Sequence, residues 1–146
     1  MIALIQRVSE AEVRVGSERV AAIGRGVLAL IGVQRGDSTE TGARLLERIL
    51  SYRVFPDAAG RMNVSLREVG GGLLLVPQFT LAADTGKGTR AGFSSAAAPE
   101  EAQRLFAALL DRAQAAYAPV SAGVFGAHMQ VSLVNDGPVT FLLICR

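Results

Sequence analysis

The sequence predicts a single α/β domain over residues 1–146, with two main helices and a mixed, largely antiparallel sheet of about seven strands, barrel-like in character. Three observations support this fold class. The chain of 146 residues has the length of one domain. Its hydrophobic content of 50% supplies one core. Apolar stretches of strand length outnumber the two stretches with helical periodicity, and adjacent strands with so few helices favour a mixed or antiparallel sheet.

The first part of the chain is predicted to contain strands and a hairpin. Residues 11–15 alternate between apolar and polar side chains, and Gly16 and Ser17 turn the chain toward the next strand. Residues 27–33 are apolar throughout, as is typical of a central, buried strand. The strands predicted here span residues 2–8, 11–15, 19–23 and 27–33.

Two stretches have the periodicity of amphipathic helices. The first begins where Asp37 and Glu40 have capping-box spacing, and the second begins with Pro99 in the first helical position. The second helix lies between two predicted strands and can serve as a crossover. The predicted buried faces are Leu45, Leu46, Ile49 and Leu50 in the first helix, and Ala102, Leu105, Phe106, Leu109, Leu110 and Ala113 in the second.

The remaining segments are short strands, turns and one long loop. Residues 84–95 are rich in Gly, Ser and Thr without periodicity, which predicts a loop. Turns are predicted at 55–60 and 135–138, and strands at 64–66, 73–81, 127–134 and 139–144.

Composition and charge limit the kinds of partner and the compartment. The net charge is +2, and Lys87 is the only lysine, so arginine supplies almost all of the positive charge. No strong basic stripe is visible, so a nucleic acid is expected to be held over a short stretch. No apolar run reaches the roughly 18–20 residues of a membrane span, Cys145 is the only cysteine, and the N-terminus does not resemble a signal peptide. We therefore expect a cytoplasmic protein without a membrane segment.

Two polar patterns interrupt the apolar strands. Gln78 and Thr80 are two residues apart in the predicted strand 73–81, so they point to the same face and can orient a polar substrate. From spacing alone, a strand edge with one solvated face is the favoured interpretation. Gly137 and Pro138 lie in an Asn-Asp-Gly-Pro sequence, which by itself predicts a hairpin turn between two strands. A cis bond between Gly and Pro is possible there but rare.

Hydrolase chemistry based on protein side chains has a weak basis in the sequence. Thr80 as nucleophile, His128 as base and Asp84 as the orienting group form a conceivable set. His128 is the only histidine, and a lone histidine is more often partly buried with a structural role. No Gly-x-Ser-x-Gly motif exists. One His and one Cys without clustered carboxylates predict no metal site, and no cofactor is expected.

The loop at residues 84–90, Asp-Thr-Gly-Lys-Gly-Thr-Arg, superficially resembles a phosphate-binding loop. Its Gly-Lys pair is followed by Gly88 instead of Ser or Thr, and no helix begins there, so a nucleotide-hydrolysing loop is excluded. A flexible loop whose amides, Lys87 and Arg90 contact an RNA backbone remains open.

Two motifs together resemble the paired signature of the D-aminoacyl-tRNA deacylases, the D-tyrosyl-tRNA deacylase family. They are Pro-Gln-Phe-Thr-Leu at 77–81 and Asn-Asp-Gly-Pro-Val-Thr at 135–140. Either motif alone is weak, but both occur in order and at family-like separation. The similarity covers essentially the whole chain, including residues 1–8, 53–57, 60–63, 81–85 and 129–135.

The resemblance implies an editing hydrolase and a set of site residues. Gln78, Phe79 and Thr80 would line the pocket for the terminal adenosine and the aminoacyl ester. Gly137 and Pro138 would form a cis element that enters the pocket of a partner subunit, which makes the family dimeric. Such an enzyme cleaves the ester of D-aminoacyl-tRNA and of mischarged glycyl-tRNA. It releases the free amino acid and tRNA, and it rejects L-aminoacyl-tRNA.

Pro77 and Met129 are expected beside this pocket, in substrate binding and chiral selection. The family usually has serine where this chain has Pro77, so a hydroxyl and a backbone N–H are both lost. If that N–H binds substrate, affinity or rate decreases. If the serine only supports the strand, proline is tolerable at a sheet edge.

The lack of a convincing acid–base pair agrees with catalysis by orientation, because an aminoacyl ester is already reactive. The resemblance implies that the 2′-hydroxyl of the terminal ribose assists the attacking water, while the carbonyl groups of Gly137 and Pro138 exclude an L side chain. A nucleophilic Thr80 ranks second. Two further classes remain open: a non-catalytic RNA-binding module, and an esterase that uses Thr80 and His128 on small esters.

Overall fold

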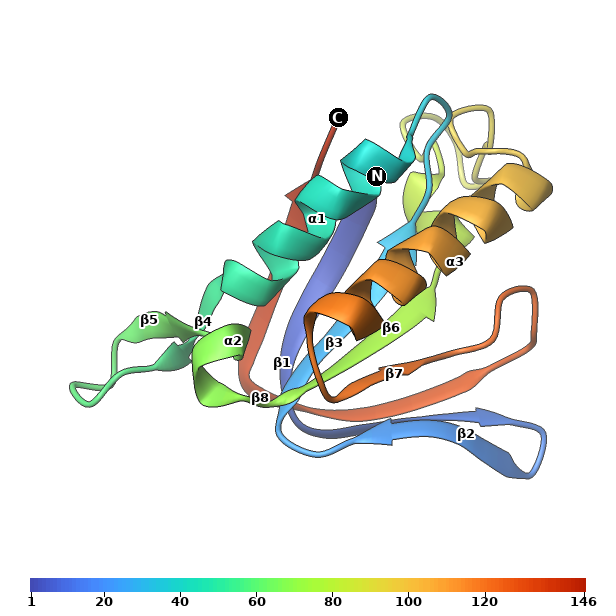
Figure 1. The fold of residues 1–146 in the computed structure, drawn as a ribbon. Helices are drawn as coiled ribbons and strands as arrows, with labels where there is room; N and C mark the ends of the chain where they lie inside the picture. The colour runs from blue at the N-terminus through green and yellow to red at the C-terminus, as the bar shows by residue number, and fades with distance from the viewer.

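A six-stranded mixed sheet is the framework of the structure, a computed structural model that describes all 146 residues (Figure 1). Its strands are β1 (Ile2–Val15), β2 (Glu18–Ile23), β3 (Gly26–Gly32), β6 (Gly72–Pro77), β7 (Val120–Ala122) and β8 (Gln130–Ile144). A separate two-stranded sheet consists of β4 (Arg53–Pro56) and β5 (Met62–Ser65). The helices are α1 (Thr39–Ser51), α2 (Leu66–Val69) and α3 (Pro99–Ala116). None of them is long and apolar enough to cross a membrane.

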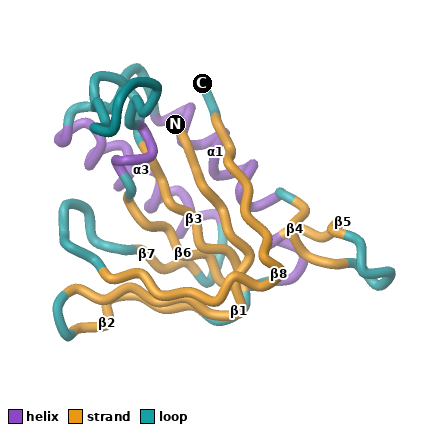
Figure 2. Tube along the Cα trace, turned by 180° about the vertical axis from the view of Figure 1, so that it is seen from behind, coloured by secondary structure: helices purple, strands orange, loops and turns teal.

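β1 is the central strand of the main sheet. It pairs antiparallel with β2, β3 and β8, whereas the β3–β6 and β6–β7 pairs are parallel. The predicted mixed, largely antiparallel sheet is confirmed, with eight strands in place of about seven. β1 and β8 bend together where their register shifts, and this bend gives the sheet its barrel-like curvature (Figures 1 and 2).

Two apolar cores lie on the two faces of the sheet. α1 and α3 lie side by side over one face (Figure 1), and both predicted helices are confirmed. Because side chains alternate along a strand, Leu73 and Leu75 of β6 pack in the core under the helices, while Leu74 and Val76 pack in a smaller core on the other face. The predicted apolar stripe of α1 is fully buried, and in α3 only Leu110 of the predicted face is half-buried.

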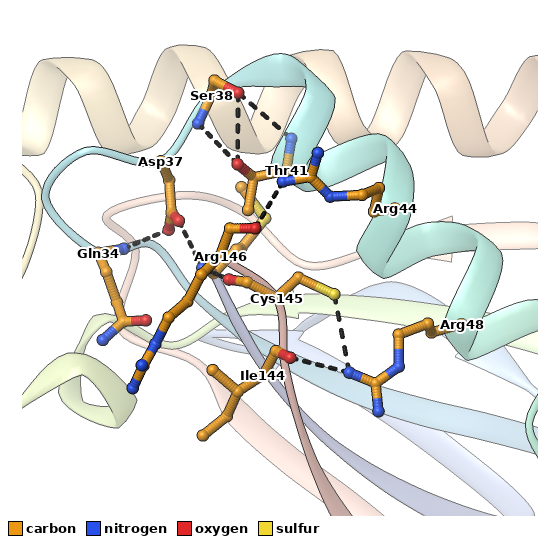
Figure 3. A network of polar contacts seen from close by, with 10 residues as sticks. Gln34, Asp37, Ser38, Thr41, Arg44, Arg48, Ile144, Cys145 and Arg146 are labelled. Carbon is orange, nitrogen blue, oxygen red and sulfur yellow. Dashed lines mark hydrogen bonds and ion pairs between the residues drawn. The ribbon is translucent and has the colours of Figure 1, made fainter.

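The start of α1 differs from the prediction by one residue. Ser38 is the N-cap, and its Oγ accepts the N–H of Thr41 at 3.3 Å, so Asp37 and Glu40 do not form the capping box. Asp37 has another role: its Oδ1 lies 2.5 Å from the amino group of Met1, which also donates to a backbone carbonyl near the C-terminus (Figure 3). The carboxylate therefore connects the first strand to the beginning of α1.

Several predicted boundaries change because strands pair over long distances. The predicted strands 2–8 and 11–15 form one strand, β1, and the predicted strands 127–134 and 139–144 form β8. α3 is a crossover as expected, but it leads from β6 to the parallel strand β7 and not to β8. The prediction lacked β4, β7 and α2, each of which has only three or four residues.

Candidate active site

A cleft of about 450 Å³ opens at the carboxyl end of β6, beside the start of α3. Its lining residues come from three segments, 76–79, 97–102 and 125–131, and most of them are hydrophobic. Four predicted site residues line it together, although they lie far apart in the sequence: Pro77, Gln78, Phe79 and Met129. Thr80, a fifth predicted site residue, directly follows Phe79 in the sequence but does not itself line the cleft.

A 3-10 turn after β6, η1 (Phe79–Ala82), places the first motif at the rim of the cleft. Gln78 donates its backbone N–H to Ile31 O at 2.7 Å, which keeps the chain attached to β3 as β6 ends. The side chains then meet, with Gln78 Nε2 donating to Thr80 Oγ1 at 2.5 Å. The prediction that both residues lie on one face of a strand is wrong, because the strand ends at Pro77. The turn nevertheless brings their side chains together.

Close packing against β3 fixes the position of this turn. A Cβ on Gly32 would lie 2.8 Å from Leu81 Cβ and 3.2 Å from Gln78 O, so the strand needs glycine at this approach. The N–H groups of Phe79 and Thr80 open the turn, and the first N–H groups of a helical turn have no partner within it.

Pro77 occupies a position at which the sheet needs no backbone donor. Leu73 donates its N–H to Pro119 O, on the β7 side, and position 77 has the same orientation because the two sides of a strand alternate. The pairing of β6 with β7 ends at Leu75 and Ala122. No strand therefore stands beside Pro77 to accept an N–H, which agrees with the second of the two alternatives, in which the sheet tolerates proline at this position.

The opposite wall of the cleft comes from the segment before β8. Met129 Sδ accepts the N–H of Val124 at 3.4 Å, and a Cβ on Gly123 would lie 2.8 Å from the same sulfur. His128 also lines the cleft, is exposed, and has no hydrogen-bond partner. The expectation that His128 is partly buried is wrong, because β8 begins only at Gln130 and leaves the preceding residues in an exposed connection.

The candidate set of Thr80, His128 and Asp84 is not assembled. Thr80 Oγ1 accepts from Gln78, Asp84 Oδ1 accepts the N–H of Gly86 at 2.9 Å, and no hydrogen bond joins any two members of the set. Only His128 lines the cleft. No group of three or more His, Cys, Asp or Glu side chains is arranged to hold a metal ion. The polar side chains that line the cleft are thus those of Gln78 and His128.

The second motif, residues 135–140, forms a bulge inside β8. The prediction of a hairpin turn between two strands is therefore wrong. Residues 136–139 stand opposite Arg7 alone, between the β1 pairs made by Asn135 and Thr140. Both halves of β8 pair with the same strand, which local turn chemistry cannot reveal. The Gly137–Pro138 peptide bond is cis, as the resemblance implied.

Two side chains hold this bulge. Asn135 closes its base: Oδ1 accepts the N–H of Val139, and Nδ2 donates to Thr140 Oγ1, both at 2.8 Å. Arg7 donates from Nε to Asp136 O and from Nη1 to a carbonyl of β4, both at 2.7 Å. Sequence reasoning missed Arg7, although a single charge within the apolar opening of the chain is a signal that could have found it.

The bulge lies outside the cleft of its own chain. Asp136, Gly137 and Pro138 are exposed, and none of them lines the cleft. Gly137 has a φ of 149°, and a Cβ there would lie 2.6 Å from Val139 Cγ2, so the bulge requires glycine. A single copy therefore brings the first motif to the cleft and leaves the second motif unpartnered.

The shifted pKa values in the chain have structural causes. Hydrogen bonds from Ser65 lower the pKa of the Glu68 carboxyl at the start of α2, and a hydrogen bond from Arg67 lowers that of Glu47. Burial raises the pKa of Tyr117, whose hydroxyl donates to the carbonyls of Leu66, at the start of α2, and Gly71, after its end. None of these residues lines the cleft, so the shifts belong to helix caps and packing.

Fold and cleft define a single-domain α/β protein with a cleft at the end of an inner strand, β6, and a glycine–proline bulge on an edge strand, β8. The family model described as D-Tyr-tRNA(Tyr) deacylase matches residues 4–144. The chain belongs to this family, which confirms the resemblance seen in the two motifs.

Similar proteins cover the chain almost completely. D-aminoacyl-tRNA deacylases from Thioalkalivibrio sulfidiphilus and Methylococcus capsulatus are 67% and 62% identical to it, over 98% and 99% of this chain and 96% and 95% of theirs. A solved structure named c-Myc DNA Unwinding Element Binding Protein is 37% identical, with a TM-score of 0.94 over 99% of this chain and 98% of the other.

Proposed function

We propose that the chain hydrolyses the ester of D-aminoacyl-tRNA at an active site that two copies build together. Membership in the deacylase family, and relatives with that name at more than 60% identity, support the activity. One observation carries the two-copy site: the Gly137–Pro138 bulge is exposed and does not line the cleft of its own chain. An enzyme acting on tRNA in translation works in the cytoplasm, where we place it.

The reaction consumes one water molecule for each ester. Water adds to the ester carbonyl, the tetrahedral oxyanion collapses, and the ribose oxygen leaves with a proton, so that free D-amino acid and tRNA are released. We assign the oxyanion to the N–H groups of Phe79 and Thr80, because fixed donors stabilise charge that develops in the transition state. The hydrogen bond between the side chains of Gln78 and Thr80 supports the turn that presents these donors.

The attacking water must be activated, and the cleft contains no assembled acid–base pair that could activate it. We assign this activation to the 2′-hydroxyl of the terminal ribose, which lies next to the ester and is held with it. The Thr80 hydroxyl accepts a hydrogen bond from Gln78 and has no base beside it, which argues against a nucleophilic role.

An apolar stripe on β8 supports a homodimer. β8 is an edge strand that pairs only with β1. Val134, Leu142 and Ile144 lie at outward positions of this strand and are 50%, 55% and 43% exposed. Exposed apolar side chains on a long edge strand mark an interaction surface. A second copy that covers this stripe would also bring its own bulge next to the first copy.

Selection of configuration follows from exclusion in this arrangement. The carbonyl groups of the partner's Gly137 and the partner's Pro138 would border the Cα of the bound aminoacyl group, on the side where an L side chain would stand. A wall at that place rejects a configuration and not a particular side chain. Different D-amino acids, and glycine without any side chain, would therefore be accepted.

A deacylation assay with matched D- and L-aminoacyl-tRNA tests the activity. We expect hydrolysis of the D form and no release from the L form above the spontaneous rate. Release from neither form would leave the non-catalytic RNA-binding module as the function. Equal release from both forms would contradict chiral selection.

The role of Thr80 is tested with the same assay. Thr80→Ala is expected to retain most of the activity, whereas a substrate with a 2′-deoxy terminal ribose is expected to lose it. A loss of several orders of magnitude in Thr80→Ala, as removal of a nucleophile causes, would establish the covalent alternative.

A loss of about 10³-fold or more in folded His128→Ala, the scale of a general base, would support the esterase alternative.

A further inference from the structure

Two aromatic rings are exposed at the rim of the cleft, and only one of them lines it. Phe79 lines the cleft and is 58% exposed. Phe93 is 43% exposed and packs against Phe79 from outside the cleft, with ring centroids 5.1 Å apart and planes tilted by 41°. The pair forms apolar surface that continues from the cleft toward the loop at 84–95.

The segment that carries Phe93 is fixed at its base. Asp84 and Gly92 exchange two backbone hydrogen bonds of 2.8 and 2.9 Å, which close the loop between them. Ser95 Oγ donates to Ala82 O at 2.5 Å and connects the far side of the segment to η1. The ring of Phe93 is therefore placed by the fold, independently of the loop tip.

The loop closed by these bonds is basic. Residues 85–91 contain Lys87 and Arg90 and no acidic residue. Both cations are exposed, and neither takes part in the six ion pairs of the structure. After Phe93 the chain lines a second cleft with Arg35, and none of its lining residues is hydrophobic. The segment that carries the exposed aromatic ring thus lies between a basic loop and a polar cleft.

We propose that Phe93 is a stacking platform for the unpaired nucleotide that precedes the terminal adenosine of the tRNA, with Lys87 and Arg90 binding its phosphates. The inference rests on the proposed function, in which the ester and the terminal ribose occupy the cleft. The preceding nucleotide must then leave across the rim, where Phe93 adjoins Phe79. Bases of single-stranded RNA stack on aromatic side chains while cations follow the backbone.

The charges distinguish RNA from a second protein copy as the occupant. Two cations without acidic partners attract a polyanion, and they repel the same loop of another copy. The apolar stripe suited to contact between copies lies on β8, a different element. The surface around Phe93 is therefore assigned to the nucleic acid.

Two substrates of different length test the platform. Phe93→Ala is expected to lower kcat/KM on D-aminoacyl-tRNA at least about fivefold more than on D-aminoacyl-adenosine, because one base–aromatic stack contributes at least that factor. Phe93→Tyr keeps the ring and should behave as the wild type on both substrates. Met62→Ala removes a side chain of similar exposure, 45%, from β5 and is the control.

The other possible outcomes contradict either the stacking role of Phe93 or the proposed function, and the two cases can be told apart. Equal losses on both substrates would place Phe93 in the support of the cleft, and no loss on the tRNA would remove it from substrate binding. A dimer that dissociates in Phe93→Ala would assign the surface to a second copy. If the wild type hydrolyses neither substrate, the proposed function fails. Binding of a fluorescent ribotrinucleotide, cytidine-cytidine-adenosine, then decides: equal affinity of wild type and Phe93→Ala overturns the platform.

Discussion

At the scale of single residues, the shape of the Gly137–Pro138 bulge depends on Arg7. Its side chain is only 13% exposed, and its guanidinium donates to carbonyl groups of the bulge and of β4. We expect Arg7→Ala to lower the free energy of unfolding by about 2 kcal/mol, because hydrogen bonds from charged groups contribute about 1.5–3 kcal/mol. The looser bulge should also lower the ratio of D to L hydrolysis.

Urea unfolding and the two deacylation rates measure these effects of Arg7→Ala. Arg14→Ala is the matched control on the same strand, because Arg14 forms a partly exposed pair with Glu12 and one exposed hydrogen bond to Ser17 O. The control should change stability by less than about 1 kcal/mol. An Arg7→Ala protein with unchanged stability and an unchanged D to L ratio would show that the bulge does not need this side chain.

At the scale of elements, the parallel pairing of β3 with β6 depends on glycine at the start of β3. A Cβ on Gly26 would lie 1.9 Å from the carbonyl oxygen of Gly72, a backbone atom that cannot move aside. We expect Gly26→Ala to destabilise the protein by about 3 kcal/mol, the upper part of the range for overpacking. Gly24→Ala, with nothing within 4 Å, is the control. Similar urea midpoints for both variants would contradict this account.

Local patterns predicted the elements whose causes are local. The stripe Leu45, Leu46, Ile49 and Leu50 defined α1, and Pro99 marked the first residue of α3. In contrast, β6 extends to Pro77 through its parallel pairing with β3, whose last pair joins Ile31 and Pro77. The continuity of β8 through Gly137 depends on its long pairing with β1. These partner strands lie far away in the sequence. The local turn residues at 135–138 therefore predicted a hairpin where the chain continues as one strand.

The candidate site divides in the same way. Pro77, Gln78, Phe79 and Met129 belong to sequence motifs and were found from them. Arg7 and Phe93 act through contacts across strands and loops, which motifs do not contain.

At the scale of the whole molecule, the outward stripe of β8 is expected to hold two copies together. Leu142→Lys places a charge at a position that is 55% exposed in one copy and would be covered in a dimer. We expect it to shift the mass measured by sedimentation from dimer to monomer and to abolish chirally selective deacylation. Met62→Lys, at a side chain 45% exposed on β5, should do neither. A monomeric wild type, or a dimeric Leu142→Lys, would remove β8 from the interface.

The central claim is that the cleft of one copy uses the bulge of the other, and dimers of two different chains test it most directly. Gly123→Leu is expected to disable a cleft, because even a Cβ there would lie 2.8 Å from the sulfur of Met129, which lines the cleft and would be displaced into it. Gly137→Ala displaces a bulge, because its Cβ lies 2.6 Å from Val139 Cγ2. The two changes are placed either on different chains or on the same chain opposite an unaltered one, and each mixed dimer is isolated with two affinity tags.

With the changes on different chains, the working cleft faces an unaltered bulge, so the account predicts hydrolysis of D-aminoacyl-tRNA and rejection of the L form. With both changes on one chain, the working cleft of the other chain faces the displaced bulge, and the L form should be hydrolysed as well. Hydrolysis of the L form only when the changes lie on different chains would show that each cleft uses its own bulge, and would contradict the account.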